Sequence, residues 1–402
     1  MSLDRRAVIG LGVLGLSAAA TASYVFLRDR PDMRGLVGES ATVSGYAGGE
    51  KMAFIQNPKT VDALKRRGLV MNADREGSVD QVRDPVLLGR KPDFLWPSSA
   101  PLVELAKKNA KVLKDQVIFN SPIVIYSWAP IADGLVKAGL ATKEAAHYTV
   151  DCKALVSAVL AGKPWSELGQ ANLYGHVRLI ATDPNKSNSG FMFAGLTANL
   201  LAGDVADETN LPKVLPQVVE LFRIMGFKSG SSGQVFDDFI AGGPGADPLV
   251  VGYENQLVEW IMADPDRWKR VLQSPVSQPV TLYPQPTVYS AHPLIALTQG
   301  SLPLIDAMMS QELQTIGWQD HGFRGPLGAI GATTNPLVAG RMPAEVSNVA
   351  PMPDVNVMLM ILDALAAPAG QGADVNAPAA PPDSNANASV PTVRPPGDSR
   401  EH

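Results

Sequence analysis

Short apolar runs of strand length alternate along the chain with segments whose apolar residues recur every three to four positions. A short apolar run is typical of a buried strand, whereas the wider spacing is typical of a helix. Strands are predicted at 39–49, 92–99 and 176–183, a long strand pair at 116–128 and a β-rich segment at 281–298. Helices are predicted at 60–69, 101–113, 150–168, 190–203, 215–227, 232–243 and 302–322, and a strand running into a helix at 248–262. This alternation predicts an α/β fold in which helices flank the sheets.

Small hydrogen-bonding residues gather where four of the predicted strands end. In open α/β sheets, ligands bind outside the carboxyl ends of the strands, so these positions are candidate ligand contacts. The candidates are Ser44, Gly45 and Tyr46, then Ser98 and Ser99, then Lys186, Ser187, Asn188, Ser189 and Gly190, and finally Tyr253 and Glu254.

The group that precedes the predicted helix at 190–203 has two interpretations. A helix start leaves about four backbone N–H groups without partners, and Ser187 or Ser189 could accept from one of them as a cap. The same N–H groups, at the positive end of the helix dipole, could instead hold an anion, and Gly190 would let it approach the backbone. One such group alone favours the cap. Four groups of the same kind favour a ligand site.

Tyr253 and Glu254 fit an anion site less well. A carboxylate in the site opposes a bound anion unless a cation offsets it, and Lys186, Lys51 and Arg324 are candidates for that cation. A site that contains the Glu254 carboxylate could also bind a zwitterion or a cation. The alternative for both residues is a strand end that packs its ring and solvates its acid. We therefore expect a small polar or anionic ligand without naming it.

The sequence carries no recognisable catalytic motif. It lacks G-x-S-x-G, a phosphate loop, a dinucleotide fingerprint and H-E-x-x-H. The five histidines are scattered, and the one cysteine, Cys152, lies in a predicted helix, so neither metal nor disulfide is predicted. We expect a binding protein that is not an enzyme and has no cofactor. A hydrolase or transferase with dispersed active residues is the weaker alternative.

Composition sets further limits on the class of protein. Of the 402 residues, 46% are hydrophobic and 18% are charged, which is typical of a globular protein. The net charge of -5 argues against nucleic acid as a partner, because nucleic-acid binding needs a basic surface. Residues 367–402 are rich in Pro, Ala, Asn and Ser and are predicted to be a disordered tail.

The first 33 residues resemble an export signal. Arg5 and Arg6 precede an uncharged apolar stretch at 7–27, and Ala20-Thr21-Ala22 could be a cleavage site. The stretch is also long enough to cross a bilayer, so a retained anchor is the other interpretation, which we slightly favour. Either way, we expect the folded part on the periplasmic or extracellular face.

With these residues in view, most of 36–345 resembles the type II periplasmic solute-binding proteins of transport systems. The resemblance rests on the order of several segments along the chain. They are the Ser-Gly loop at 43–49, the serines after 94–96, the long strand at 116–128, G-K-x-W at 162–165, D-P-x-x-S-x-S-G at 183–190 and the strand into helix at 248–262. Lys186 stands where the phosphate-binding branch has arginine, which argues against phosphate itself.

The resemblance implies two α/β lobes joined by hinge strands, with the ligand in the cleft between them. The predicted boundaries are a signal or anchor at 1–33, lobe 1 at 34–127, lobe 2 at 128–250, lobe 1 again at 251–350, a C-terminal helix at 351–366 and the tail at 367–402. The implied function is capture of a solute for an ABC-type uptake or sensing system, with an ABC permease or another membrane protein as partner. The alternative is a module of the same fold that has no ligand and docks a membrane partner.

Overall fold

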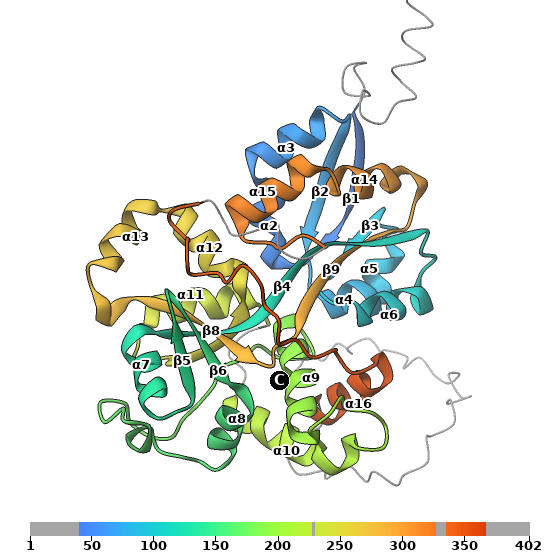
Figure 1. Ribbon diagram of the computed structural model, residues 1–402. Coiled ribbons are helices and arrows are strands. Elements are labelled where there is room, and N and C mark those ends of the chain that lie inside the picture. The colour runs from blue at the N-terminus through green and yellow to red at the C-terminus, as the bar shows by residue number, and fades with distance from the viewer. Residues whose placement is uncertain (1–39, 227–229, 327–334, 367–402) are drawn as a thin grey trace, which may run out of the picture. The chain divides into compact units, whose positions relative to one another are not determined.

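The computed structural model describes residues 40–226, 230–326 and 335–366. It confirms the predicted α/β class: strands form the centre and helices flank them (Figure 1). The strands are β1 (Ala41–Ala47), β2 (Leu69–Arg75), β3 (Phe94–Trp96), β4 (Lys114–Trp128), β5 (Ala141–Glu144), β6 (His147–Asp151), β7 (Leu249–Tyr253), β8 (Pro279–Gln285) and β9 (Tyr289–Ala296). The N-terminal segment and the C-terminal tail lie outside the described residues.

The strands fall into two halves that share β4. In order, they run β2-β1-β3-β9-β4-β8-β6-β5, and β7 also pairs with β4. Residues Lys114–Pro122 of β4 pair with β9, whereas Ile123–Trp128 pair with β7 and β8. We call the strands on the β9 side the first half and those on the β8 side the second half. A second connection between the halves runs from β8 to β9 through 286–288.

Helices cover both faces of the first half, because its strands alternate their side chains between two apolar clusters. Phe94 and Trp96 pack with residues of one set of helices, and Leu95 between them packs with residues of the other. The first set is α2 (Met52–Gln56), α3 (Pro58–Lys65), α14 (Leu302–Met308) and α15 (Gln311–His321); the second is α4 (Ser78–Arg83), α5 (Pro85–Gly89) and α6 (Pro101–Asn109).

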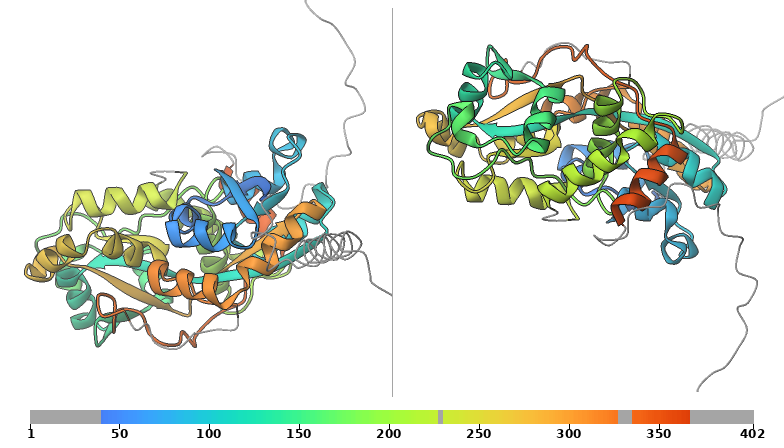
Figure 2. Two further views of the ribbon diagram at one scale, coloured as in Figure 1. Left: turned by 90° about the horizontal axis from the view of Figure 1, so that it is seen from above. Right: turned by 90° about the horizontal axis from the view of Figure 1, so that it is seen from below.

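The second half is surrounded by the remaining helices. They are α7 (Ala129–Lys137), α8 (Cys152–Leu160), α9 (Asn188–Ala202), α10 (Leu211–Met225), α11 (Ser232–Gly242), α12 (Glu254–Ala263), α13 (Pro265–Leu272) and α16 (Val355–Ala366). Helix α9 is apolar on every side and is buried from Asn188 to Leu200, because α8, α10, α16 and strands surround it. Figure 2 shows α16 beside α10 on the underside.

Several parts of the secondary structure differ from the prediction. The strand pair predicted at 116–128 is the single strand β4, and the helix predicted at 302–322 is divided into α14 and α15. The apolar residues Val177–Ala181 are buried but make only an isolated bridge, Ile180 to Val250, instead of a strand. The helix predicted at 150–168 is shorter in the structure. It forms only as α8, which ends at Leu160, and the 3-10 turn η3 (Trp165–Leu168) follows. Strand β2 and the β5–β6 hairpin were not predicted, since their side chains alternate weakly between apolar and polar.

The lobe boundaries stay a prediction. Strand β8 pairs with both β4 and β6 in the second half, whereas β9 pairs with β3 in the first. A return to the first lobe near residue 286 therefore fits the strand pairing better than a return at 251. No helix among the described residues is long and apolar enough to span a bilayer.

Replacing Phe119 by alanine tests the packing of the first half against β4. Its ring is fully buried, stacks on Phe323 at 4.9 Å and meets Phe54 edge-on at 5.0 Å between centroids. We expect Phe119→Ala to lower the free energy of unfolding by about 3–5 kcal/mol, measured by denaturant titration. The control Val86→Ala, at an exposed position, should change it by less than about 0.5 kcal/mol. Equal stabilities of the two variants would contradict this packing.

Candidate functional site

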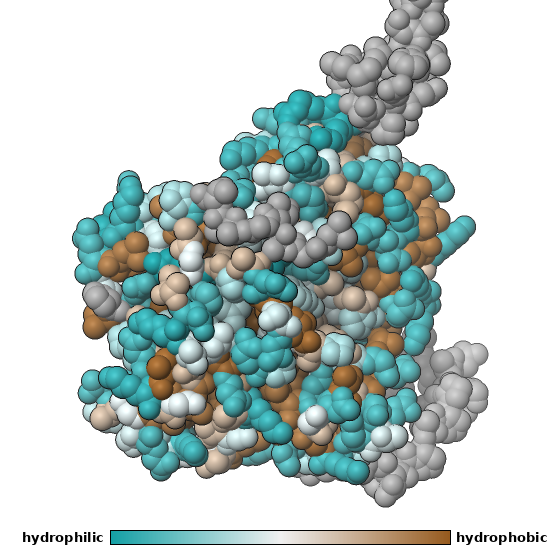
Figure 3. Space-filling view, viewed as in Figure 1, coloured by the Kyte–Doolittle hydropathy of each residue, from teal (hydrophilic) through white to brown (hydrophobic). Residues whose placement is uncertain are grey.

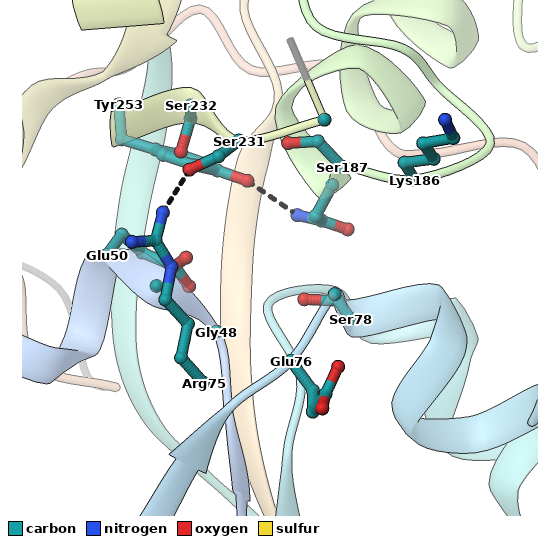
Figure 4. Close-up of a pocket in the computed structure, with 14 residues that line it drawn as sticks. Gly48, Glu50, Arg75, Glu76, Ser78, Lys186, Ser187, Ser231, Ser232 and Tyr253 are labelled. Carbon is teal, nitrogen blue, oxygen red and sulfur yellow. Dashed lines mark hydrogen bonds between the residues drawn. The ribbon is translucent and has the colours of Figure 1, made fainter. Parts of the chain in front are cut away.

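A cavity of about 260 Å³ lies where loops from the two halves meet (Figure 4). The first half contributes the turn after β1 and the loop between β2 and α4. The second half contributes the starts of α9 and α11 and the end of β7. The lining residues are Gly48, Gly49, Glu50, Arg75, Glu76, Gly77, Ser78, Lys186, Ser187, Asn188, Gly230, Ser231, Ser232 and Tyr253.

Two long helices begin at this cavity, and in neither does the serine before the helix act as its cap. In α9 the Gly190 N–H donates to Thr182 Oγ1 at 2.8 Å instead. Ser187 precedes α9 and Ser231 precedes α11, and neither side chain accepts from a backbone N–H of its helix. Ser187 Oγ lies 3.4 Å from Ser189 Oγ, and Ser231 Oγ accepts from the Arg75 guanidinium. The first-turn N–H groups of a helix carry partial positive charge. These two helix starts therefore direct backbone donors and a positive potential towards the cavity.

Two cationic side chains line the same cavity. Arg75 extends from the end of β2 and reaches Ser231 on the opposite wall, and Lys186 lies just before α9 (Figure 4). The walls approach closely here. A Cβ atom on Gly77 would lie 2.7 Å from the Lys186 carbonyl oxygen, so only glycine allows this approach.

A buried cluster of charged and polar groups lies behind one wall. Lys51 Nζ is 2.5 Å from Glu50 Oε1, 2.7 Å from Ser98 Oγ and 3.2 Å from His292 Nδ1. Burial alone would raise the pKa of Glu50, but Lys51 and His292 bring that pKa well below its usual value. Burial lowers the pKa of Lys51, and the Glu50 carboxylate partly offsets this.

His292 is the neutral member of this cluster. Burial, followed by the charge of Lys51, lowers the pKa of His292 to about 4. Because an ammonium group only donates, Nδ1 accepts from Lys51, and the proton of the neutral ring is assigned to Nε2. Among the described residues, Nε2 has no hydrogen-bond partner.

Asn188 joins the two halves at the inner end of the cavity. Its Nδ2 donates to the Ser98 carbonyl oxygen at 2.7 Å and to the Tyr253 hydroxyl at 3.0 Å, and lies 3.3 Å from Ser290 Oγ. Ser290 also donates to the Ser98 carbonyl. Ser98 belongs to the first half and Asn188 to the second. This network therefore holds the start of α9 against the loop after β3.

Glu254 forms a separate buried ion pair. Arg324 Nε lies 2.7 Å from Glu254 Oε2 and Nη2 lies 2.7 Å from Oε1, and the Tyr283 hydroxyl donates to the same carboxylate at 2.5 Å. Burial opposes the charge of Arg324, but Glu254 raises its pKa above the usual value. Glu254 is thus engaged by Arg324 and Tyr283 and does not line the cavity.

The structure brings together only some of the residues predicted from the sequence. Lys186, Ser187, Asn188 and Tyr253 line the cavity, and Ser98 lies directly behind it. The others lie elsewhere. Ser44 and Gly45 line a different surface hollow, Tyr46 donates to the Leu87 carbonyl, and Ser99 is buried. The Ser189 hydroxyl and the Gly190 N–H form hydrogen bonds with Thr182, and Glu254 pairs with Arg324. A ligand role for any of these residues stays a prediction.

Several cavity residues were not predicted as ligand contacts. Ser231 and Ser232 show the same signal as Ser187, a serine at a predicted helix start, so the sequence could have indicated them. Arg75, Glu76 and Gly77 follow β2, a strand that the sequence pattern did not predict. Their arrival at the cavity depends on the pairing of β2 with β1. Within the described residues, no cluster of His, Cys, Asp or Glu is arranged to hold a metal ion.

No family model and no curated protein matches this sequence. Solved structures do match. A periplasmic thiamin binding protein has 11% identity and a TM-score of 0.57, over 81% of this chain and 96% of its own. Iron-bound HitA from Pseudomonas aeruginosa has 10% identity and a TM-score of 0.53, over 81% and 100%. AfuA from Actinobacillus pleuropneumoniae, with fructose-6-phosphate bound, has 12% identity and a TM-score of 0.50, over 81% and 97%.

At these identities the likeness establishes the fold and nothing finer. The chain has the two-lobed α/β fold of periplasmic solute-binding proteins, as the resemblance predicted. The face shown in Figure 3 intersperses hydrophilic and hydrophobic residues. We therefore look for the function in the cavity between the two halves.

The pH dependence of stability tests the environment of His292. An unfolded chain binds the proton near pH 6.5 and the folded chain only near 4, so acidification between these values favours unfolding. Between pH 6.5 and 4.5 this residue should lower the free energy of unfolding by about 2–3 kcal/mol, measured by denaturant titration at each pH. Glu50, whose pKa is lowered, would contribute only below its usual value of 4.5.

The matched variants are His292→Gln and His176→Gln. His292→Gln should lose less stability over that range than the unmodified protein does. His176 is exposed, so His176→Gln should follow the unmodified protein. If His292→Gln and the unmodified protein lose the same amount, the histidine does not titrate as described.

Proposed function

We propose that this protein is an exported solute-binding protein that captures a small polar or anionic solute in the cavity between its two halves. The observation that carries the proposal is the composition of that cavity: the starts of α9 and α11, which their preceding serines do not cap, lie at it together with Arg75 and Lys186. Backbone donors, helix dipoles and cations in one place are the usual means of holding an anion.

The size of the cavity limits the solute. Small-molecule sites usually enclose roughly 300–1,000 Å³, so a cavity of about 260 Å³ suits a small solute. The solute would contact residues of both halves at once. Binding would therefore favour the arrangement in which the halves meet, and β4 with 286–288 would carry the hinge motion.

Electrostatic balance supports an anion despite the acids in the wall. Glu50 is paired with the buried Lys51, so the two together are close to neutral. In Figure 4 the carboxylate of Glu76 lies below Ser78, on the side away from Ser231. Arg75 and Lys186 supply positive charge near the helix starts, where Asp237 interacts with Arg75 and Asp80 with Lys186.

Export and partnership extend this proposal. The predicted signal or anchor at 1–33 would place the folded part outside the cytoplasmic membrane. The thiamin binding protein and AfuA, which have a similar fold, are periplasmic binding proteins. An ABC permease, or another membrane protein that senses the loaded state, would be the partner. Binding and release without turnover would be the activity, because the cavity offers donors and charge but no activated nucleophile is seen among its described residues.

Replacing the cations tests the site. We would screen sulfate, phosphate, carboxylic acids and amino acids by thermal shift and measure each hit by titration calorimetry. Hydrogen bonds to charged groups contribute about 1.5–3 kcal/mol, so Arg75→Ala and Lys186→Ala should each weaken a bound anion by about 10–100-fold. Arg66→Ala is the matched control, because Arg66 is exposed and pairs with Glu312 away from the cavity.

The screen also has an outcome that contradicts the proposal. At a concentration of 100 times the dissociation constant, a ligand adds about 2.7 kcal/mol to the free energy of unfolding, which a thermal shift detects. If no compound of these classes stabilises the folded protein, the proposal fails and the alternative without a ligand stands. If Arg66→Ala weakens binding as much as Arg75→Ala does, the solute binds elsewhere.

A further inference from the structure

Two acceptor oxygens belong to residues that line the cavity. One is Oδ1 of Asn188, which is buried and has no hydrogen-bond partner among the described residues, and the other is Oε2 of Glu50, whose carboxylate is bonded through Oε1. Both residues line the cavity, and both are almost completely buried: the Asn188 residue is 4% exposed and the Glu50 side chain is 6% exposed. A buried acceptor without a donor costs about 1–3 kcal/mol, so Asn188 Oδ1 calls for a partner. Glu50 Oε2 adds a second acceptor beside the cavity.

The orientation of the Asn188 amide follows from its contacts. The Ser98 carbonyl oxygen lies 2.7 Å from one end of the amide, and a carbonyl can only accept. That end must therefore be the NH₂ group, which also bonds Tyr253. The other end is the oxygen. It is buried and has no partner within the described part of the chain.

The Glu50 carboxylate is held in a fixed position by its other oxygen. Oε1 accepts from Lys51 Nζ at 2.5 Å and from the Ser98 hydroxyl. The neighbouring cation keeps the pKa of Glu50 low, so the group is ionised and can only accept. Oε2 lies beside Gly48, since a Cβ atom there would be 2.7 Å from it. Gly48 itself lines the cavity.

From these two acceptors we infer that the solute is an acid that also carries hydrogen-bond donors, as an amino acid or a hydroxy acid does. This inference rests on the proposed function. The acidic group would bind at the starts of α9 and α11 with Arg75 and Lys186. The amino or hydroxyl group would donate to Glu50 Oε2 and Asn188 Oδ1. A fully ionised oxyanion such as sulfate has no donor to offer either acceptor.

Matched series of small acids test this by calorimetry. In the carboxylate series, isobutyrate, lactate and alanine have similar shapes but differ in carrying a methyl, hydroxyl or amino group. In the sulfonate series, propane-1-sulfonate, isethionate and taurine differ in the same way, and sulfate is the donor-free reference. We expect the hydroxyl or amino member of at least one series to bind about tenfold or more tightly than its methyl analogue, and more tightly than sulfate. Comparison of hydroxyl with amino identifies the donor.

Variants at Glu50 link the preference to its carboxylate. Glu50→Gln should reduce the preference for the donor-bearing member to about threefold or less, while binding of the methyl analogue is kept or strengthened. Because this change leaves Lys51 buried without its carboxylate, the double variant Glu50→Gln with Lys51→Met provides a neutral cluster. It should show the same loss of preference. Arg66→Ala, away from the cavity, should keep the preference of the unmodified protein.

The outcomes separate this inference from the proposed function. If sulfate or the methyl analogues bind as tightly as the donor-bearing acids, the inference is wrong and the proposed function stands. The inference is also wrong if the preference survives in both folded Glu50 variants. If no acid of any series binds to the folded protein, both the inference and the proposed function fail.

Discussion

The architecture depends on one constraint, the sharing of strand β4 by both halves of the molecule. Its fifteen residues pair with β9 along the first part and with β7 and β8 along the second. Burial of Ile123–Trp128 on both faces holds the strand in place. The loops at the cavity are therefore brought together from distant parts of the chain. Strand β4 and residues 286–288 both connect the halves, and the chain also passes from α15 in the first half to α16 in the second.

Helix starts in this protein differ in how their first N–H groups are used. Asp151 caps α8 by accepting from the backbone of Ala154 at 2.9 Å, as Ser310 caps α15. The N-cap residues of α9 and α11 make no such bond, although they are serines and could. Asn210 before α10 and Ser301 before α14, away from the cavity, do not cap their helices either. A cap was the simpler interpretation of Ser187 in the sequence, and the structure shows that its side chain makes no such bond; a ligand role for Ser187 stays a proposal.

Buried charges at the boundary between the halves are paired, and this determines which groups a solute can meet. Arg324 satisfies Glu254, and Lys51 satisfies one oxygen of Glu50. Pairing of this kind is costly to break, because the remaining charge stays buried. The groups that remain for a solute are hydrogen-bond donors near Lys186 and acceptors near Asn188.

The sequence by itself determined the α/β class and indicated part of the cavity lining, because apolar periodicity and residues at helix starts are local signals. It placed Lys186, Ser187, Asn188 and Tyr253 among the candidates, and the cavity contains all four. Only the tertiary structure decided that Ser44 and Glu254 lie outside this cavity and that Arg75 lies within it. Those outcomes depend on strand pairing and on partners such as Arg324, seventy positions from Glu254. Contacts over such distances along the chain leave no local pattern in the sequence.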